Sequence, residues 1–78
     1  MTHLVTVISR ADCHLCEVAL EVVQRVCAES GTALEVVDVD ADIDLRRRYG
    51  DQVPVILVDG AQHDFWRVDE HRLRAALQ

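Results

Sequence analysis

The sequence predicts an α/β fold with the element order β-α-β-α-β-β-α and a four-stranded mixed sheet flanked by helices. Short apolar runs rich in β-branched residues alternate with segments whose apolar residues recur at three- and four-residue spacing. Turn-forming residues separate these segments at Ser30-Gly31, Gly50 and Asp59-Gly60. Since the chain has 78 residues, half of them apolar, it has room for one core. We therefore expect residues 1–78 to form a single domain.

The first three elements are predicted to form a β-α-β unit. Residues 4–9 have the β-branched, apolar composition of a buried strand. Residues 13–29 are predicted to be helical, with Ser30-Gly31 as the stop signal. The apolar residues with helical spacing are Leu15, Ala19, Val22, Val23 and Val26. Residues 34–39 form the second predicted strand, which is parallel to the first because a helix connects them.

A short helix and the third strand follow. We expect the helix to run through residues 46–49, with Asp42 or Asp44 as its N-terminal cap and Gly50 at its end. Residues 53–58 are apolar and rich in β-branched side chains, which predicts a strand. Pro54 lies at the entrance of this strand, where a missing N–H is tolerated.

The last part of the chain is predicted to add an edge strand and a terminal helix. Asp59-Gly60 is a turn signal, so residues 62–66 are expected to return as an antiparallel edge strand. Residues 69–77 are predicted to be helical, with Leu73, Ala76 and Leu77 toward the sheet.

The composition argues against two kinds of partner. The net charge of −6 disfavours nucleic acid, because binding phosphates requires a basic face. The cluster Arg46-Arg47-Arg48 follows four aspartates and is interpreted as a solvated charged face. No apolar stretch approaches the roughly 18 residues of a membrane span, and the N-terminus lacks the pattern of a signal peptide. We therefore expect a cytoplasmic protein without a nucleic-acid or membrane partner.

A Cys-x-x-Cys pair lies at the predicted junction of the first strand and the long helix. Cys13 and Cys16 are one helical turn apart, and the helix N-terminus favours the thiolate, which is the nucleophilic form. Cys16 lies one turn before Ala19 and Leu20, so we expect it to be more buried than Cys13. This asymmetry suits Cys13 as the attacking cysteine and Cys16 as the resolving cysteine that closes a disulfide.

Several neighbouring residues allow two interpretations. His14 either stabilises the Cys13 thiolate as an imidazolium or is an exposed histidine without effect on the thiol. Asp12 acts in the opposite direction, because a carboxylate beside Cys13 disfavours its ionisation. Trp66 either packs at the sheet edge or contacts a substrate. Cys27 is expected to be a small buried apolar residue, with a regulatory thiol or an intermolecular bridge as the alternatives.

With these motifs in this order, the chain resembles the thioredoxin fold in its minimal glutaredoxin form over essentially its whole length. Arg10 lies three positions before Cys13, where glutaredoxins carry a basic residue, and we expect it to bind an anion such as a thiol tripeptide carboxylate. Val53-Pro54 matches the dipeptide before the third strand, with Gln52 where many members have threonine. The succession CHLC, YG, VPV, DG and FWRVDE is similar to an uncharacterised glutaredoxin-like subfamily of small bacterial proteins.

The resemblance implies roles for three further residues. Pro54 would follow a cis peptide bond. Val53 would offer its N–H and C=O to an extended substrate or to the cysteinyl part of glutathione. Asp69 would hold the amino group of a γ-glutamyl moiety. The sequence departs from glutaredoxins at Phe65 and Trp66, which fill space that a Gly-Gly pair leaves open there.

Together these features predict an enzyme, a glutaredoxin-like thiol–disulfide oxidoreductase. Its substrates would be protein disulfides or mixed disulfides of small thiols, attacked by Cys13 and resolved by Cys16. A low-molecular-weight thiol (glutathione or an equivalent) or a flavoprotein reductase would restore the dithiol. We expect a monomer with no tightly bound cofactor and no metal. Two alternatives stay open: a thiolate metal or iron–sulfur site at the two cysteines, and a non-catalytic adaptor whose apolar edge binds a protein.

Overall fold

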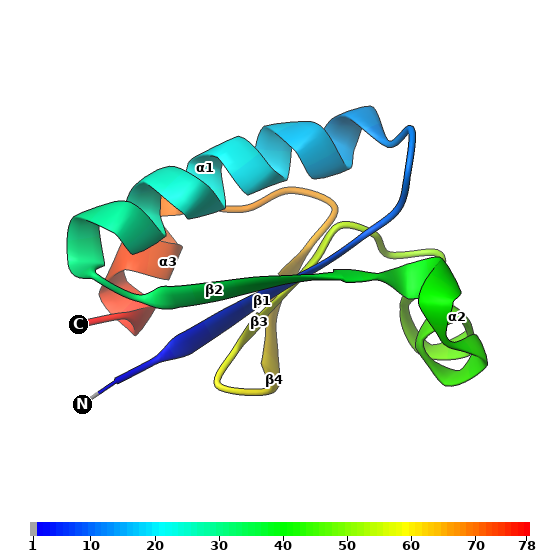
Figure 1. The fold of residues 1–78 in the computed structure, drawn as a ribbon. Helices are drawn as coiled ribbons and strands as arrows, with labels where there is room; N and C mark the ends of the chain where they lie inside the picture. The colour runs from blue at the N-terminus through cyan, green and yellow to red at the C-terminus, as the bar shows by residue number, and fades with distance from the viewer. Residues whose placement is uncertain (1) are drawn as a thin grey trace.

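The computed structural model describes residues 2–78 and has the predicted order of strands and helices (Figure 1). The strands are β1 (Leu4–Ser9), β2 (Ala33–Asp38), β3 (Val55–Val58) and β4 (Ala61–Phe65). The helices are α1 (His14–Ser30), α2 (Ile43–Tyr49) and α3 (Glu70–Ala76), and a 3-10 turn, η1 (Val39–Ala41), precedes α2. No helix in this part of the chain is both long enough and apolar enough to cross a bilayer.

The strands form one mixed sheet in the order β2-β1-β3-β4. β1 and β2 are parallel, as predicted from their helical connection, whereas β3 is antiparallel to both β1 and β4. Ile8 near the end of β1 pairs with Val55 at the start of β3. The loop that follows β1 and the loop that precedes β3 therefore lie at the same end of the sheet.

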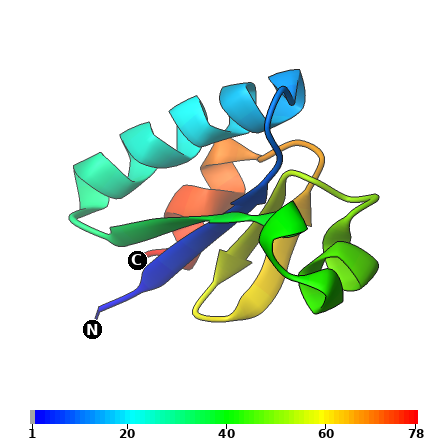
Figure 2. The same cartoon turned by 45° about the vertical axis from the view of Figure 1, so that its right-hand side comes forward.

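α1 and α3 cover one face of the sheet, whereas α2 lies at one end of the sheet and packs only against that end of the other face (Figures 1 and 2). The core under α1 and α3 consists of Val5, Val7, Ala19, Val23, Val26, Cys27, Ile56, Leu73 and Leu77. The smaller core near α2 consists of Ile8, Val39, Tyr49 and Val55. Because side chains alternate along a strand, neighbouring residues of β1 and β3 serve different cores, which explains why Val7 and Ile8 in β1 and Val55 and Ile56 in β3 are all apolar and buried.

Two details of the elements differ from what the sequence pattern indicated. The apolar spacing that predicted this helix included Leu15, but its side chain is 43% exposed, whereas Cys16, which was expected to be buried, is 4% exposed and lies in the stripe that faces the sheet. The apolar spacing in the sequence is compatible with two rotations of the helix about its axis. Packing against the sheet selects the rotation that buries Cys16, Ala19 and Val23. The third strand begins at Val55 instead of residue 53, because Pro54 has no N–H to continue the ladder.

Gly31 ends α1 in the left-handed region, with φ of 67°. Its N–H and that of Thr32 both point to the carbonyl oxygen of Cys27, which satisfies a C-terminal acceptor of the helix. The same turn directs the chain into β2. A glycine is needed here because a Cβ makes this conformation unfavourable.

We expect Gly31→Ala to lower the free energy of unfolding by about 1–2 kcal/mol, because alanine disfavours the left-handed conformation. Gly31→Asn is the matched control and should cost less, since asparagine visits this region more readily. Denaturant unfolding followed by circular dichroism measures both. Equal stability of the alanine variant and the parent would contradict this account of the helix end.

Candidate redox site

Cys13 and Cys16 form a disulfide at the start of α1, with their Cα atoms 5.2 Å apart. Cys13 is the N-cap residue, and its Sγ accepts a hydrogen bond from the Cys16 N–H at 3.2 Å. Cys13 is partly exposed, whereas Cys16 is buried beneath the helix. The predicted difference in exposure between the two cysteines is therefore confirmed.

The loop before β3 lies at the same end of the sheet as the cysteines and contains a cis peptide bond between Val53 and Pro54. The cis bond that the family resemblance implied is thus confirmed. Pro54 is buried and Val53 is partly buried. Within residues 2–78, neither the N–H nor the C=O of Val53 takes part in a backbone hydrogen bond.

Arg10 connects the loop before Cys13 to the segment around α2. Its guanidinium binds both carboxylate oxygens of Asp40, at 2.9 and 3.3 Å, and donates to the Gly50 carbonyl oxygen at 3.2 Å. Arg46 binds the same carboxylate at 3.1 Å. The hydrogen bond from Arg10 is the main reason why the pKa of Asp40 lies below its usual value. The anion-binding role of Arg10 stays a prediction, because in this structure its guanidinium is engaged by Asp40 and the Gly50 carbonyl oxygen.

His14 and Asp69 lie on different elements, at the start of α1 and at the N-terminal cap of α3. The His14 side chain is 86% exposed, and its Nδ1 lies 3.9 Å from the Glu17 carboxylate. Asp69 caps the N-terminus of α3, where its carboxylate accepts from the Arg72 N–H at 3.1 Å. The Asp69 N–H in turn donates to the Asp64 carboxylate at 3.1 Å. Asp69 is therefore a helix cap in this structure, and its contact with a γ-glutamyl group stays a prediction.

Trp66 fixes the loop between β4 and α3 against the loop before β3. Its N–H donates to the Pro54 carbonyl oxygen at 2.8 Å, and its indole Nε1 donates to the Asp51 carbonyl oxygen at 3.0 Å. The ring packs edge-on against Phe65, with 5.0 Å between centroids. Trp66 has φ of 63°, an uncommon conformation for a bulky residue. Both the edge-packing and the substrate-contact interpretations fit this position, because the side chain is still 53% exposed.

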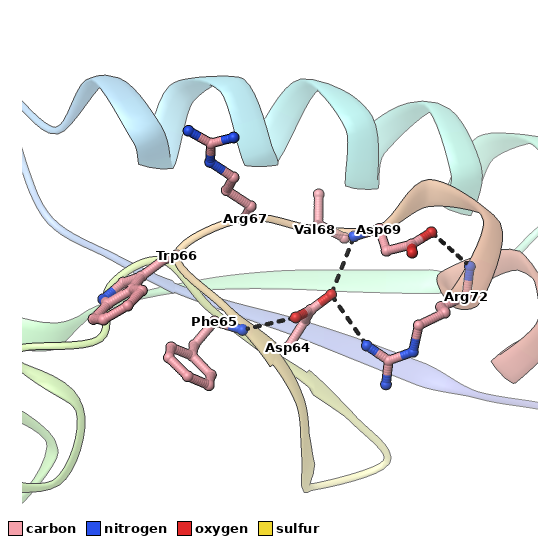
Figure 3. A pocket seen from close by; sticks show the side chains of 7 residues that line it. All are labelled: Asp64, Phe65, Trp66, Arg67, Val68, Asp69 and Arg72. Carbon is pink, nitrogen blue, oxygen red and sulfur yellow. Dashed lines mark hydrogen bonds and ion pairs between the residues drawn. The ribbon is translucent and has the colours of Figure 1, made fainter.

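A groove of about 330 Å³ runs between the first turns of α1 and the β4–α3 loop. Its walls are Leu15, Val18, Ala19 and Val22 from α1 and Trp66, Arg67 and Val68 from the loop, with His14 at one end. Figure 3 shows Arg67 and Val68 pointing toward α1. Sequence reasoning missed this groove, although the spacing of residues 15, 18 and 22 along one helix flank is a signal for it.

Cys27 is buried in the core under α1 and α3, as predicted. Burial raises the pKa of its thiol, because the charged form would be desolvated. In the described part of the chain, no three His, Cys, Asp or Glu side chains are grouped as metal ligands.

Solved structures with this architecture define the class of protein. The oxidised thioredoxin of Plasmodium falciparum matches with a TM-score of 0.65 over 96% of this chain and 77% of that chain, at 14% identity. The chain therefore has the α/β thioredoxin fold that was predicted. Protein Ne2328 from Nitrosomonas europaea gives a TM-score of 0.86 at 28% identity, over 100% of this chain and 94% of that chain. Protein XcR50 from X. campestris gives 0.76 at 37% identity, over 94% and 93%.

Residues 4–78 match the Glutaredoxin-like domain (DUF836), and the chain belongs to this family. The uncharacterized protein Rv0508 of Mycobacterium tuberculosis (strain ATCC 25618 / H37Rv) is 40% identical over 76 residues, covering 91% of this chain and 78% of that protein. The uncharacterized protein Mb0520 of Mycobacterium bovis gives the same values. The predicted resemblance to a glutaredoxin-like subfamily is therefore confirmed.

We expect Asp40→Asn to destabilise the protein near neutral pH, because Arg10 and Arg46 lose their shared carboxylate. The folded-state pKa of Asp40 lies below its usual 3.8, so the ion pair stabilises the fold above that pH and its contribution disappears as pH falls through the lower pKa. The difference in free energy of unfolding between the parent and the variant should therefore shrink on acidification.

Denaturant unfolding at several pH values tests this dependence. Glu21→Gln is the matched control, because it removes one exposed carboxylate from α1 and should change stability little at any pH. A destabilisation by Asp40→Asn that is the same at every pH would contradict the role of the charged carboxylate.

Proposed function

We propose that this chain is a dithiol–disulfide oxidoreductase in which Cys13 is the nucleophile and Cys16 the resolving cysteine. The observation that carries the proposal is the Cys13–Cys16 pair at the N-terminus of α1, with one cysteine accessible and the other buried. The membership of a glutaredoxin-like family supports it.

The reaction begins from the reduced dithiol. The Cys13 thiolate attacks one sulfur of a substrate disulfide, a Cys13–substrate disulfide forms, and the other substrate sulfur leaves as a thiolate that takes up a proton. Cys16, as a thiolate, then attacks the Cys13 sulfur. The Cys13–Cys16 disulfide closes, and the second substrate thiol is released. Two electrons pass from the protein to the substrate.

The start of α1 supports the first step. The Cys16 N–H already points to the Cys13 sulfur, and the helix N-terminus adds positive potential, so both features favour a thiolate at this position. His14 would add to this effect as an imidazolium. Asp12 would oppose it, since its carboxylate precedes the nucleophile in the sequence.

The unpaired backbone of Val53 provides a way to hold the substrate. An extended peptide that hydrogen-bonds to the Val53 N–H and C=O would be fixed at the end of the sheet where the dithiol lies. A low-molecular-weight thiol, glutathione or an equivalent, or a flavoprotein reductase would then return two electrons to the Cys13–Cys16 disulfide.

We expect Cys13→Ser to reduce disulfide exchange to the uncatalysed rate, because the nucleophile is lost. Cys16→Ser should accumulate a mixed disulfide on Cys13, because the resolving step is missing. Incubation of each reduced variant with a disulfide peptide, followed by acid quenching and intact-mass measurement, detects the adduct.

Cys27→Ser is the matched control, since it removes a buried thiol that takes no part in the reaction. This variant should keep the exchange rate of the parent if it is folded. Full activity of Cys13→Ser, or an adduct that maps to Cys27, would overturn the assignment of roles.

A further inference from the structure

The first three turns of α1 present two apolar stripes, and the sheet covers one of them. Cys16, Ala19 and Val23 are buried against the sheet and α3. Leu15, Val18 and Val22 form a second flank that lines the groove, where Leu15 is 43% and Val18 is 46% exposed, whereas Val22 is partly buried against the same core. An uncovered apolar stripe beside a reactive pair is a typical feature of a binding surface.

The groove lies beside the Cys13–Cys16 pair and the loop that precedes β3. Two of its lining residues, His14 and Leu15, are the residues between the two cysteines. Its opposite wall contains Trp66, whose N–H is bonded to the Pro54 carbonyl oxygen in the loop that would hold an extended peptide. The groove is therefore lined by the neighbours of both cysteines and by a residue bonded to the loop of Val53 and Pro54.

The charge in the groove is opposite to that of the whole chain. The net charge is −6, yet no carboxylate lines this groove. Arg67 lines it and has no partner among the ion pairs of residues 2–78. Figure 3 shows that its guanidinium lies near α1, whereas the contacts of Asp64 and Asp69 are made with Arg72 and backbone N–H groups.

We propose that this groove binds a polypeptide segment beside a substrate disulfide, with an apolar side chain against Leu15 and Val18 and a carboxylate on Arg67. Arg67 is then a specificity-determining residue for the oxidoreductase. The inference rests on the proposed function and adds the substrate class: protein disulfides flanked by apolar and acidic residues.

A polypeptide fits these walls better than a charged tripeptide thiol. Glutathione has no large apolar side chain to cover the exposed flank of α1. The residues expected to hold the charged ends of a tripeptide are engaged elsewhere, Arg10 with Asp40 and Asp69 with the first turn of α3. A peptide supplies an apolar side chain for the flank and needs one cation, which Arg67 provides.

The test compares rates of disulfide reduction for short synthetic peptides, each with one cysteine in a mixed disulfide with mercaptoethanol. One peptide carries leucine and glutamate beside the cysteine, one carries leucine and lysine, and one carries glycine and glutamate. We expect the parent protein to reduce the leucine–glutamate peptide roughly 5-fold faster than the leucine–lysine peptide, as for a partly exposed ion pair. This preference should weaken as salt is added.

Two variants locate the preference. Arg67→Glu should reverse the order of the glutamate and lysine peptides. Leu15→Ser combined with Val18→Ser should slow reduction of the leucine–glutamate peptide roughly 10-fold and leave the glycine–glutamate peptide nearly unchanged. The matched control is Arg47→Glu, which makes the same charge change on α2, away from the groove, and should keep the order of the parent.

Two reference substrates separate the possible failures. Bis(hydroxyethyl) disulfide is small and uncharged and has nothing to bind in the groove, so its reduction by the parent, Arg67→Glu, Arg47→Glu and the double serine variant shows whether the dithiol of each protein still reacts. If the parent does not reduce it at all, the proposed function fails and the inference falls with it. If it is reduced normally but Arg67→Glu and Arg47→Glu act alike on the peptides, the groove inference alone is overturned. The groove inference would also be overturned if the parent reduced glutathione disulfide faster than any peptide and Arg67→Glu lost this advantage. The groove would then be a site for a small thiol.

Discussion

The packing of α1 on the sheet is the constraint from which the rest of the site follows. Val23 and Val26 are almost fully buried against a core shared with β1, β3 and α3. An α-helix has a fixed angular spacing of side chains, so burying this stripe sets the direction of every other residue on the helix. Cys16 consequently lies on the helix face that packs against the sheet, and Cys13 lies at the helix N-terminus, where it is partly exposed. The different accessibility of the two cysteines is thus a consequence of helix phase.

A second constraint comes from the antiparallel pairing of β1 and β3. The pairing of Ile8 with Val55 brings the loop before Cys13 level with the loop before β3. Side chains and backbone then hold the neighbouring loops together: Arg10 binds Asp40 and the Gly50 carbonyl oxygen, and the Trp66 N–H binds the Pro54 carbonyl oxygen. Each exposed interaction is individually weak in water. Several of them acting on short loops of a small domain still limit how far the groups around the dithiol can move apart.

Much of this arrangement was predictable because it depends on local sequence signals. Periodicity, glycine stops and the proline at a strand entrance gave the order of elements and the burial of Cys16 and Cys27. Features that depend on contacts between distant residues were not predictable in this way. Arg10 and Asp40 are 30 residues apart, and nothing in the local pattern indicates their ion pair. The left-handed conformation of Trp66 even contradicts local propensity, since it depends on hydrogen bonds to residues 51 and 54.

The position of Leu15 shows how one ambiguity in the sequence bears on the functional site. Apolar residues of α1 fall into two adjacent stripes, and the apolar spacing that predicted this helix included Leu15 from one stripe together with Ala19 and Val23 from the other. Cys16 is buried only when its own stripe packs against the sheet, and this packing leaves Leu15 and Val18 exposed to solvent. Exposing them is unfavourable in water, and in a chain of 78 residues few apolar side chains are available for the core. Together with Trp66, these two residues place three of the large exposed apolar side chains along one groove at the dithiol. The rotation of α1 about its axis therefore determines two properties of the site together. The rotation that buries Cys16, the resolving cysteine, also exposes Leu15 and Val18 next to Cys13, the attacking cysteine.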